Sequence, residues 1–262
     1  MGSGRGTVEF VLSSTVRADV VESIGADRKT TDELLAELAA STSAVYSALG
    51  ELDEQGLVAE TEEGWRLTGS GRVLADIVAH RERCERVLAA SSDYFETHDT
   101  SVLPGEFRLR IGALAGGQLV TATETEPQRA VREVSDRVAA ADSARVISPI
   151  YVDSYAEAMP DSQTSKLLLG DTLVESLLDS GRAQVEGSPF EECEVRTGAV
   201  GVALAVTDEE LLLSLPRLDG GYDSETELVV ETERARAWGD RLFEHYWQRA
   251  QPLEAFADGI DS

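Results

Sequence analysis

The chain has 262 residues, of which 42% are hydrophobic, and its 49 acidic and 23 basic side chains give a formal net charge of −26. The hydrophobic content excludes a disordered chain, and the length suits one large domain or two smaller ones. Two distant cysteines, Cys84 and Cys193, exclude a disulfide framework and are expected to be buried thiols in a reducing cytosol, with a redox-sensing thiol as the alternative.

The acidic residues are spread along the whole chain, and all basic residues except Lys29 and Lys166 are arginines. Such a surface stays hydrated in a cytosol near molar salt, where the Debye length is ~3 Å. The composition resembles that of halophilic archaeal proteins, and an ordinary acidic protein is the alternative. No apolar run approaches the ~18 residues of a membrane span, and the start, MGSGRG, lacks the apolar core of a signal peptide. We therefore expect a cytoplasmic protein that does not bind membranes.

Three helices are predicted in the first part of the chain. Valine and isoleucine recur on one helical face of residues 16–24. Thr30 and Glu33 have the spacing of a capping box, so a second helix is expected to begin after Thr30. A third helix follows Ser41, and Gly56 is expected to end it. The residues of this third helix that face inward are Val45, Leu49 and Leu52.

Two short strands are predicted next, at residues 57–59 and 65–67, joined by the polar turn TEEG. Three helices and a hairpin make a winged helix-turn-helix, expected over residues 1–69, whose last helix enters the major groove with its N-terminal residues. The alternative to DNA contact is a solvated helix start for residues 41–47 and a plain surface arginine for Arg66. The predicted DNA-contacting residues are Arg28, Lys29, Thr42, Ser43, Tyr46, Ser47 and Arg66.

The acidic residues of this domain oppose DNA binding less than their number suggests. Those of residues 51–54 fall at the end of the third helix that leaves the groove, whereas those of residues 60–63 make the hairpin tip a poor phosphate contact. Residues 1–92 carry nine basic and sixteen acidic side chains, against fourteen and thirty-three in residues 93–262. Binding is therefore expected to depend on base contacts, water and DNA shape more than on counterion release.

One long helix is predicted from Ser70 to about Tyr94, and residues 70–97 are expected to be a linker and dimerisation segment. Its apolar residues recur at three-, four- and seven-residue steps up to Ser91. A helix of this length that leaves a small domain usually pairs with a partner. We expect a homodimer, with packing against the second domain as the alternative. The predicted dimerisation residues are Val73, Ile77, Cys84 and Leu88.

The second domain is expected over residues 98–252, after a boundary in residues 97–105, and an acidic tail over residues 253–262. Alternating strand and helix signals predict an α/β domain with a mixed sheet, and an α+β chain overall. The predicted strands are residues 118–123, 144–150, 166–169, 199–206 and 211–215, and the predicted helices are residues 127–140, 171–178 and 231–249.

Several segments of this domain follow one another in a distinctive order: SVLPGEFRLRIGAL, ARVISPIY, VALAVTDEELLLSL, LDGGYDSETELVV and RARAWGDRLFEHYW. In order and spacing they resemble the C-terminal domain of archaeal regulators named for the control of filament formation in methanogens. LTGSG, residues 67–71, is similar to the LT-x-x-G that follows the wing in many archaeal regulators. The resemblance implies a winged helix coupled to a sensor domain. Residues 184–196 depart from it, because they are shorter and more acidic than the family pattern.

The strand and helix order and the ending WGDRLFEHYW also resemble the effector domain of archaeal sugar-responsive regulators, which implies a phospholipase-D-like fold. An active enzyme of that type needs His-x-Lys, and none of His80, His98 and His245 is followed two residues later by lysine. The sequence also lacks a phosphate-cradling glycine loop with lysine, a G-x-S-x-G elbow and a metal-ligand spacing. We expect no enzyme, no cofactor and no metal site.

Polar groups at the expected strand ends are the candidates for ligand binding: Arg110, Ser148, Tyr151, Asp208, Asp219, Tyr222 and Asp223. The Gly220-Gly221 turn lets the backbone approach a ligand closely, although a plain turn is the alternative. The sequence thus predicts a homodimeric transcription regulator that binds double-stranded promoter DNA and whose second domain binds a small-molecule effector or a partner protein. The alternative is a regulator that does not touch DNA and uses its winged helix to bind a protein.

Overall fold

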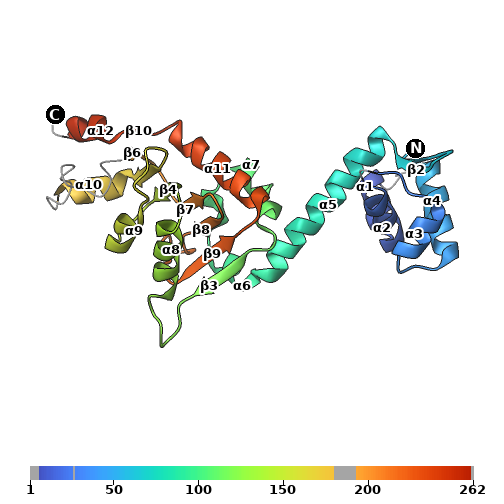
Figure 1. The fold of residues 1–262 in the computed structure, drawn as a ribbon, viewed down its shortest axis with the longest axis horizontal. Helices are drawn as coiled ribbons and strands as arrows, with labels where there is room; N and C mark the ends of the chain where they lie inside the picture. The colour runs from blue at the N-terminus through green and yellow to red at the C-terminus, as the bar shows by residue number, and fades with distance from the viewer. Residues whose placement is uncertain (1–5, 26, 180–192, 261–262) are drawn as a thin grey trace. The chain divides into compact units, whose positions relative to one another are not determined.

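The computed structural model describes residues 6–25, 27–179 and 193–260 (Figure 1). The chain divides into two compact units, residues 1–83 and residues 84–262. The first unit consists of helices and a wing-like β-hairpin, and the second is built around a mixed sheet of eight strands. The fold is therefore a mixed α/β fold, as predicted.

The first unit holds the three predicted helices, preceded by a short helix that was not predicted. Its elements are α1 (Thr7–Leu12), α2 (Thr15–Ile24), α3 (Thr31–Glu37), α4 (Thr42–Glu54), β1 (Val58–Thr61) and β2 (Gly64–Leu67). Helix α1 has six residues, too few for a helical period to stand out in the sequence. Its Val11 is fully buried in the core of the unit, together with Val20 and Val21.

Local signals fix the ends of these helices. The hydroxyl of Thr30 accepts a hydrogen bond from the backbone N–H of Glu33 at 3.3 Å, and the Glu33 carboxylate accepts one from the backbone N–H of Thr30 at 2.7 Å. This confirms the predicted capping box. The hydroxyl of Ser41 caps α4 in the same manner, and Gly56 follows the helix with a φ of +67°. Because α4 is held at both ends, its N-terminal turn has a defined direction.

The predicted long helix is interrupted. Helix α5 (Gly69–Ala90) is followed by a separate helix α6 (Ser92–Thr97), so the prediction of one helix to Tyr94 is wrong. Ser91 between them has a φ of −133°, outside the helical range. The break allows Tyr94 to pack into the core of the second unit, where it is buried. Tertiary packing has overridden a helical pattern that continues through Ser91.

The sheet of the second unit has the strand order β10-β6-β5-β4-β7-β8-β9-β3. Strands β4, β5 and β6 are parallel, and the remaining neighbours are antiparallel. The strands are β3 (Gln118–Thr121), β4 (Ala144–Ser148), β5 (Lys166–Gly170), β6 (Glu194–Gly198), β7 (Ala203–Thr207), β8 (Leu211–Ser214), β9 (Thr226–Val230) and β10 (Gln251–Pro252).

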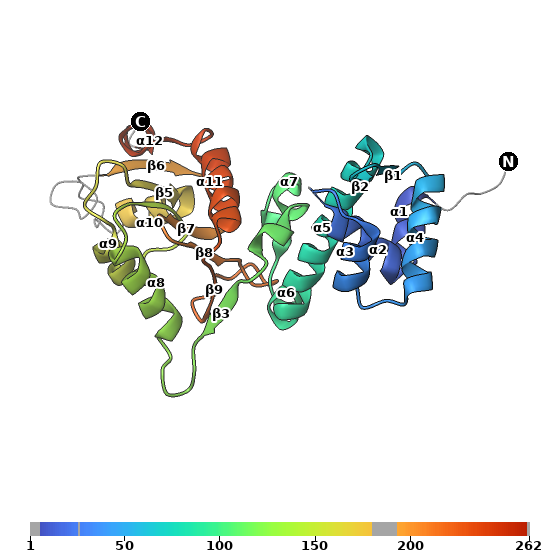
Figure 2. The same cartoon turned by 45° about the vertical axis from the view of Figure 1, so that its right-hand side comes forward.

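Helices cover both faces of this sheet. They are η1 (Thr100–Val102), α7 (Gly105–Arg108), η2 (Ile111–Leu114), α8 (Arg129–Ala139), α9 (Asp153–Ala158), α10 (Asp171–Asp179), α11 (Glu233–Trp247) and α12 (Leu253–Ile260). Helix α11 lies on the face opposite to α8 and α9 (Figure 2). Strand residues alternate between the two faces. Leu204 and Leu213 therefore join the core around α11, while Ala205 and Leu212 join the cluster beside α8.

The predicted strands and helices of this unit are confirmed, with shifted ends, but η1, α7, η2, α9, β6, β9, β10 and α12 were not predicted. The expected acidic tail is folded as far as Ile260, because Leu253 and Phe256 pack on the apolar cluster at β5 and α10. Within residues 97–105, Leu103 is fully buried and the backbone N–H of Asp99 donates to the Pro216 carbonyl at 2.8 Å, so this segment belongs to the core of the second unit.

Two remaining expectations concern residues 184–196 and the absence of a membrane span. Of residues 184–196, the part up to residue 192 lies outside the described residues, and the part from Glu194 opens β6. No helix in the described ranges is both long enough and apolar enough to cross a membrane.

Candidate functional site

The N-terminal turns of α4 present hydroxyl groups on one exposed face. Thr42, Ser43, Tyr46 and Ser47 are all exposed, and the Tyr46 side chain is 56% exposed. The opposite face of the helix is buried in the core. The Ser43 hydroxyl lies 3.2 Å from that of the capping Ser41. The structure thus brings four of the predicted DNA-contacting residues together on an exposed surface that does not pack into the core.

The predicted basic contacts Arg28 and Lys29 are partly neutralised. Lys29 forms an ion pair with Glu37, and Arg28 with Glu63. The pKa of Lys29 is raised, chiefly by its hydrogen bond to Glu37. Exposed ion pairs of this kind contribute little to stability, so another anion can replace the glutamate at little cost. Arg28 and Lys29 are therefore available to a phosphate group only by exchange.

Arg66, unlike Arg28 and Lys29, has no ion-pair partner among the described residues. It lines a surface depression together with Arg28, Arg72 and Asp27, between the end of α2, strand β2 and the start of α5. Neither Arg66 nor Arg72 forms an ion pair within the described residues. Sequence reasoning did not single out Arg72, which directly follows the LTGSG segment. Three guanidinium groups, of which that of Arg28 is paired with Glu63, against the carboxylate of Asp27 give this depression a positive balance in an otherwise acidic unit.

Helix α5 exposes most of the predicted dimerisation stripe. The neighbouring Leu74 and Val78 are buried in the core of the first unit, and Val87 is buried in that of the second. Cys84 is half-buried. The exposed fractions are 62% for Val73, 42% for Ile77 and 51% for Leu88.

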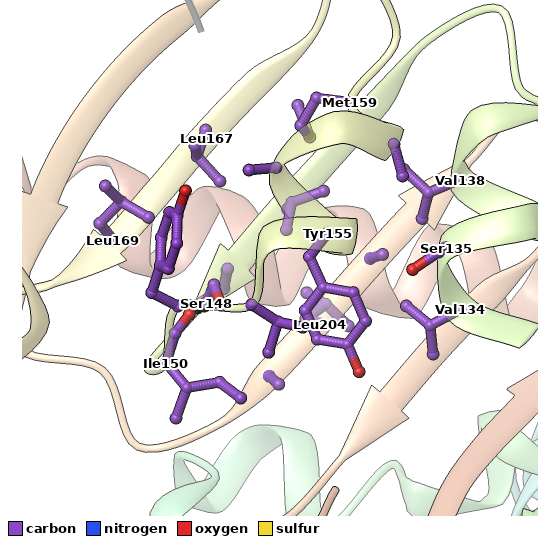
Figure 3. Close-up of a pocket in the computed structure, with 18 of the residues that line it drawn as sticks. Val134, Ser135, Val138, Ser148, Ile150, Tyr155, Met159, Leu167, Leu169 and Leu204 are labelled. Carbon is purple, nitrogen blue, oxygen red and sulfur yellow. Dashed lines mark hydrogen bonds between the residues drawn. The ribbon is translucent and has the colours of Figure 1, made fainter. Parts of the chain in front are cut away.

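A cavity in the second unit lies between the sheet and the helices α8 and α9. Its volume is about 60 Å³, and its walls come from β4, β5, β7, α8, α9 and the segments before and within β9. Val134, Ser135 and Val138 point into it from α8, and Tyr155 enters from α9 (Figure 3). Most of its lining is aliphatic, which is typical of a small-molecule site with few polar groups.

Three of the seven predicted ligand-binding residues, Ser148, Tyr151 and Tyr222, line this cavity. The others lie elsewhere. Arg110, Asp208 and Asp219 are exposed and do not line it, and the Asp219 carboxylate accepts a hydrogen bond from the Gly221 backbone N–H within its own turn. Asp223 is buried in a separate hydrogen-bond network.

Sequence reasoning missed the two polar residues that define the cavity chemically, Tyr155 and Glu227. Glu227 is 5% exposed and accepts no hydrogen bond from any residue that the structure describes. Burial, reinforced by the charge of Asp223, raises its pKa to about 8. Burial, reinforced by the charge of Glu227, also raises the pKa of Tyr155 to about 12 and that of Tyr222 well above its usual value. The cavity therefore contains neutral phenols and a carboxyl group that titrates near neutrality.

A second buried polar group anchors α6 to the sheet. His98 Nε2 lies 2.9 Å from Asp223 Oδ2, and His98 Nδ1 lies 2.7 Å from the Tyr94 carbonyl oxygen. Arg217 donates to the other Asp223 oxygen at 2.9 Å. Burial raises the pKa of Asp223, but hydrogen bonds from the Glu225 backbone N–H, His98 and Arg217 outweigh it, so the pKa lies below its usual value. Asp223 is therefore a satisfied carboxylate, in contrast to Glu227.

Family models of known proteins match a segment in each of the two units. Residues 127–249 match the family model described as the middle domain of the methanogenesis regulatory protein FilR1, and residues 5–89 match that of the HVO_A0261 N-terminal domain. Every described residue that lines the cavity falls within residues 127–249, and the exposed face of α4, Arg66, Arg72 and the α5 stripe fall within residues 5–89.

Two individual proteins are similar over most of this chain. The methanogenesis regulatory protein FilR1 of Methanothrix harundinacea (strain 6Ac) is 26% identical over 258 residues, which make up 94% of this chain and 58% of that protein. The chain thus spans little more than half the length of this relative. The archaeal chromatin protein TrmBL2, whose structure is described as showing a novel mode of DNA binding, is 16% identical with a TM-score of 0.39, over 94% of this chain and 98% of that one. A likeness at that score carries no argument about function.

Proposed function

We propose that this protein is a sequence-specific DNA-binding transcription regulator that acts in the cytoplasm as a homodimer. The first unit is a winged helix-turn-helix in which α4 enters the major groove with its N-terminal turns. The observation that carries the proposal is the exposed face of Thr42, Ser43, Tyr46 and Ser47, opposite a fully packed face of the same helix. A relative named as a regulatory protein supports the regulatory role.

Phosphate contacts in this proposal come from the depression that Arg66 shares with Arg28 and Arg72, and from Lys29 after exchange of its glutamate partner. The chain carries a net charge of −26, so few counterions are released and the affinity for DNA falls only weakly with salt. Serine, threonine and tyrosine hydroxyls then supply base-edge and backbone contacts that salt does not screen. This suits a protein that works near molar salt.

The second unit is the sensor in this proposal. It has a phospholipase-D-like fold without the catalytic His-x-Lys and binds a small-molecule effector. Residues 98–252 form the sensor and residues 70–97 link it to the winged helix of residues 1–69. Val73, Ile77 and Leu88 form the dimer contact, because exposed apolar side chains in a row on one helix gain free energy by pairing. The effector changes the spacing of the two winged helices.

The test is DNA selection with the purified full chain. Genomic fragments enriched by the protein are sequenced for a common motif, and the affinity for that motif is measured by fluorescence anisotropy. The double change Ser43→Ala, Tyr46→Ala should abolish specific binding and leave the unfolding curve unchanged, because both side chains are exposed. Glu54→Ala at the other end of α4 is the matched control and should keep the affinity. Undiminished binding by the double variant contradicts the role of α4.

A second candidate function has its own supporting observation. Arg17, Arg28 and Lys29 are all engaged by glutamates, which leaves the first unit with few free cations and suits a surface that binds a protein. Chromatin immunoprecipitation separates the two functions. A regulator that binds DNA yields sites with a shared sequence motif, whereas a pure protein-binding module yields sites without one.

A further inference from the structure

Glu227 places a carboxyl group without a protein partner in the wall of the cavity. Its backbone is fixed in β9, where Glu227 pairs with Val120 of β3, and its side chain is 5% exposed. No residue in the described ranges donates a hydrogen bond to it. An unsatisfied buried polar group destabilises a folded protein. An aliphatic residue at this position would avoid that cost, so the carboxyl group points to a ligand that completes it.

The remaining polar lining shows which ligand charge fits. Tyr151, Tyr155 and Tyr222 line the cavity, which gathers three of the six tyrosines of the chain around one carboxyl group. None of the lining residues that the structure describes is basic. Aromatic faces attract cations through their ring electrons, and tyrosines grouped around a pocket are a common way to bind an ammonium group. An anionic ligand would meet a carboxyl group and no compensating charge.

We propose that the cavity of the second unit binds a small organic ammonium ion, whose charged nitrogen lies against Glu227 and the tyrosine rings. Valine, leucine and alanine side chains of the sheet, α8 and α9 would cover its short aliphatic part. The small volume of about 60 Å³ restricts the ligand to a few carbon atoms. The inference deepens the proposed sensor role of the second unit and rests on it for its biological meaning, but the binding itself does not depend on DNA.

The proton of Glu227 adds a measurable signature. Because burial raises the pKa of Glu227 to about 8, the empty cavity at pH 7 holds a protonated carboxyl group that must ionise to pair with a cation. The titratable groups that interact with it are the phenols of Tyr94, Tyr155 and Tyr222, which stay neutral because their pKa values are raised, and the carboxylate of Asp223. The affinity for an ammonium ion should therefore rise up to about tenfold per pH unit between pH 6 and 8 and then level off.

The experiment is a ligand-observed NMR titration of the full chain with methyl-, ethyl-, propyl- and butylammonium. At the chain length that binds most tightly, the alcohol and the carboxylate of equal length serve as neutral and anionic counterparts. The ammonium ion should bind at least tenfold more tightly than the alcohol, and the carboxylate should not bind. Equal affinity for the alcohol, tighter binding of the carboxylate, or no binding of any of the four cations overturns the proposal.

Two variants assign the binding to this cavity. Glu227→Gln keeps the side-chain shape, removes the charge and should lose at least tenfold in ammonium affinity and all of its dependence on pH. Glu231→Gln, an exposed glutamate four residues further along the chain, is the matched control and should bind as the natural protein does. An unfolding curve shows that each variant is folded. Unchanged ammonium binding by folded Glu227→Gln also overturns the proposal.

The outcome can be distinguished from that of the proposed function. Ammonium binding that depends on Glu227, in a chain that selects no DNA motif, upholds the ligand and refutes the DNA-binding regulator. Motif selection by a chain that binds none of the cations upholds the regulator and refutes the ligand.

Discussion

Replacing Glu227 by glutamine should stabilise the second unit at alkaline pH and change its stability little at acidic pH. The Glu227 carboxyl has a pKa of about 8 in the folded protein and 4.5 as its reference value in the unfolded chain. Between these values the folded state binds the proton and the unfolded state does not, so the free energy of unfolding falls as the pH rises. The full difference corresponds to roughly 5 kcal/mol at pH values above 8, an upper bound because an ionised carboxylate draws in water. Against a total stability of ~5–15 kcal/mol, this loss is large.

Denaturant unfolding at pH 5.5, 7 and 9 measures this effect. Trp238 and Trp247 report on the second unit, and Trp65→Phe in every protein silences the first. The natural chain should lose stability steeply from pH 5.5 to 9, Glu227→Gln should lose less, and the difference should reach several kcal/mol at pH 9. Glu231→Gln should follow the natural chain. Parallel pH profiles for Glu227→Gln and the natural chain would refute a buried, protonated Glu227.

Three further predictions concern contacts within each unit. His98→Ala should destabilise the second unit by about 2–3 kcal/mol, because it removes a partner of the buried Asp223 carboxylate, and denaturant unfolding that is unchanged would contradict this. Thr30→Ala should destabilise the first unit by ~1 kcal/mol through loss of the capping box, followed by Trp65 fluorescence, whereas an equal loss in the second unit would count against it. The double change Val73→Glu, Ile77→Glu should convert dimer to monomer in sedimentation without shifting the unfolding midpoint, and a persistent dimer would exclude this stripe as the contact.

Features that depend on neighbouring residues in the sequence could be predicted. The capping box of Thr30 and Glu33, the glycine after α4 and the hairpin signal each act within a few residues, and all are found in the structure. The alternation of strand residues likewise follows from local pattern, which is why the principal strands of the sheet were found. The local pattern does not reveal where tertiary packing overrides it. At Ser91 the helical pattern continues, but the helix ends and Tyr94 is buried in the core of the second unit.

The chemistry of the second unit could be predicted only in part, for the same reason. Ser148, Tyr151 and Tyr222 were identified as polar groups near strand ends, and the cavity does gather them. Glu227 was passed over because a glutamate within SETELVV reads as an exposed residue, and no local signal reveals that it is buried. The contact between His98 and Asp223 joins residues 125 positions apart, a separation at which sequence spacing carries no information.

The buried network of His98 gives the proposed sensor a physical connection to α5, the helix that carries the proposed dimer contact. Tyr222 lines the cavity, and the next residue, Asp223, holds His98 of the segment that ends α6. The Leu215 backbone N–H also donates to the Tyr94 hydroxyl at 2.8 Å, so α6 is attached to the sheet at two points, and Ser91 alone separates α6 from α5. A ligand that displaces Tyr222 therefore acts on the anchor of the helix that carries Leu88.

This connection predicts a coupling that can be measured in both directions. If an ammonium ion changes the affinity for the selected DNA by some factor, DNA must change the affinity for that ion by the same factor, because the two binding free energies are linked. His98→Gln, which keeps one hydrogen-bonding group toward Asp223, should reduce the factor severalfold while each ligand still binds alone. The measurement is a DNA titration with and without the ammonium ion, for both proteins. A coupling factor that survives in folded His98→Gln would place the connection elsewhere, since the anchor of α6 would then carry none of the coupling free energy.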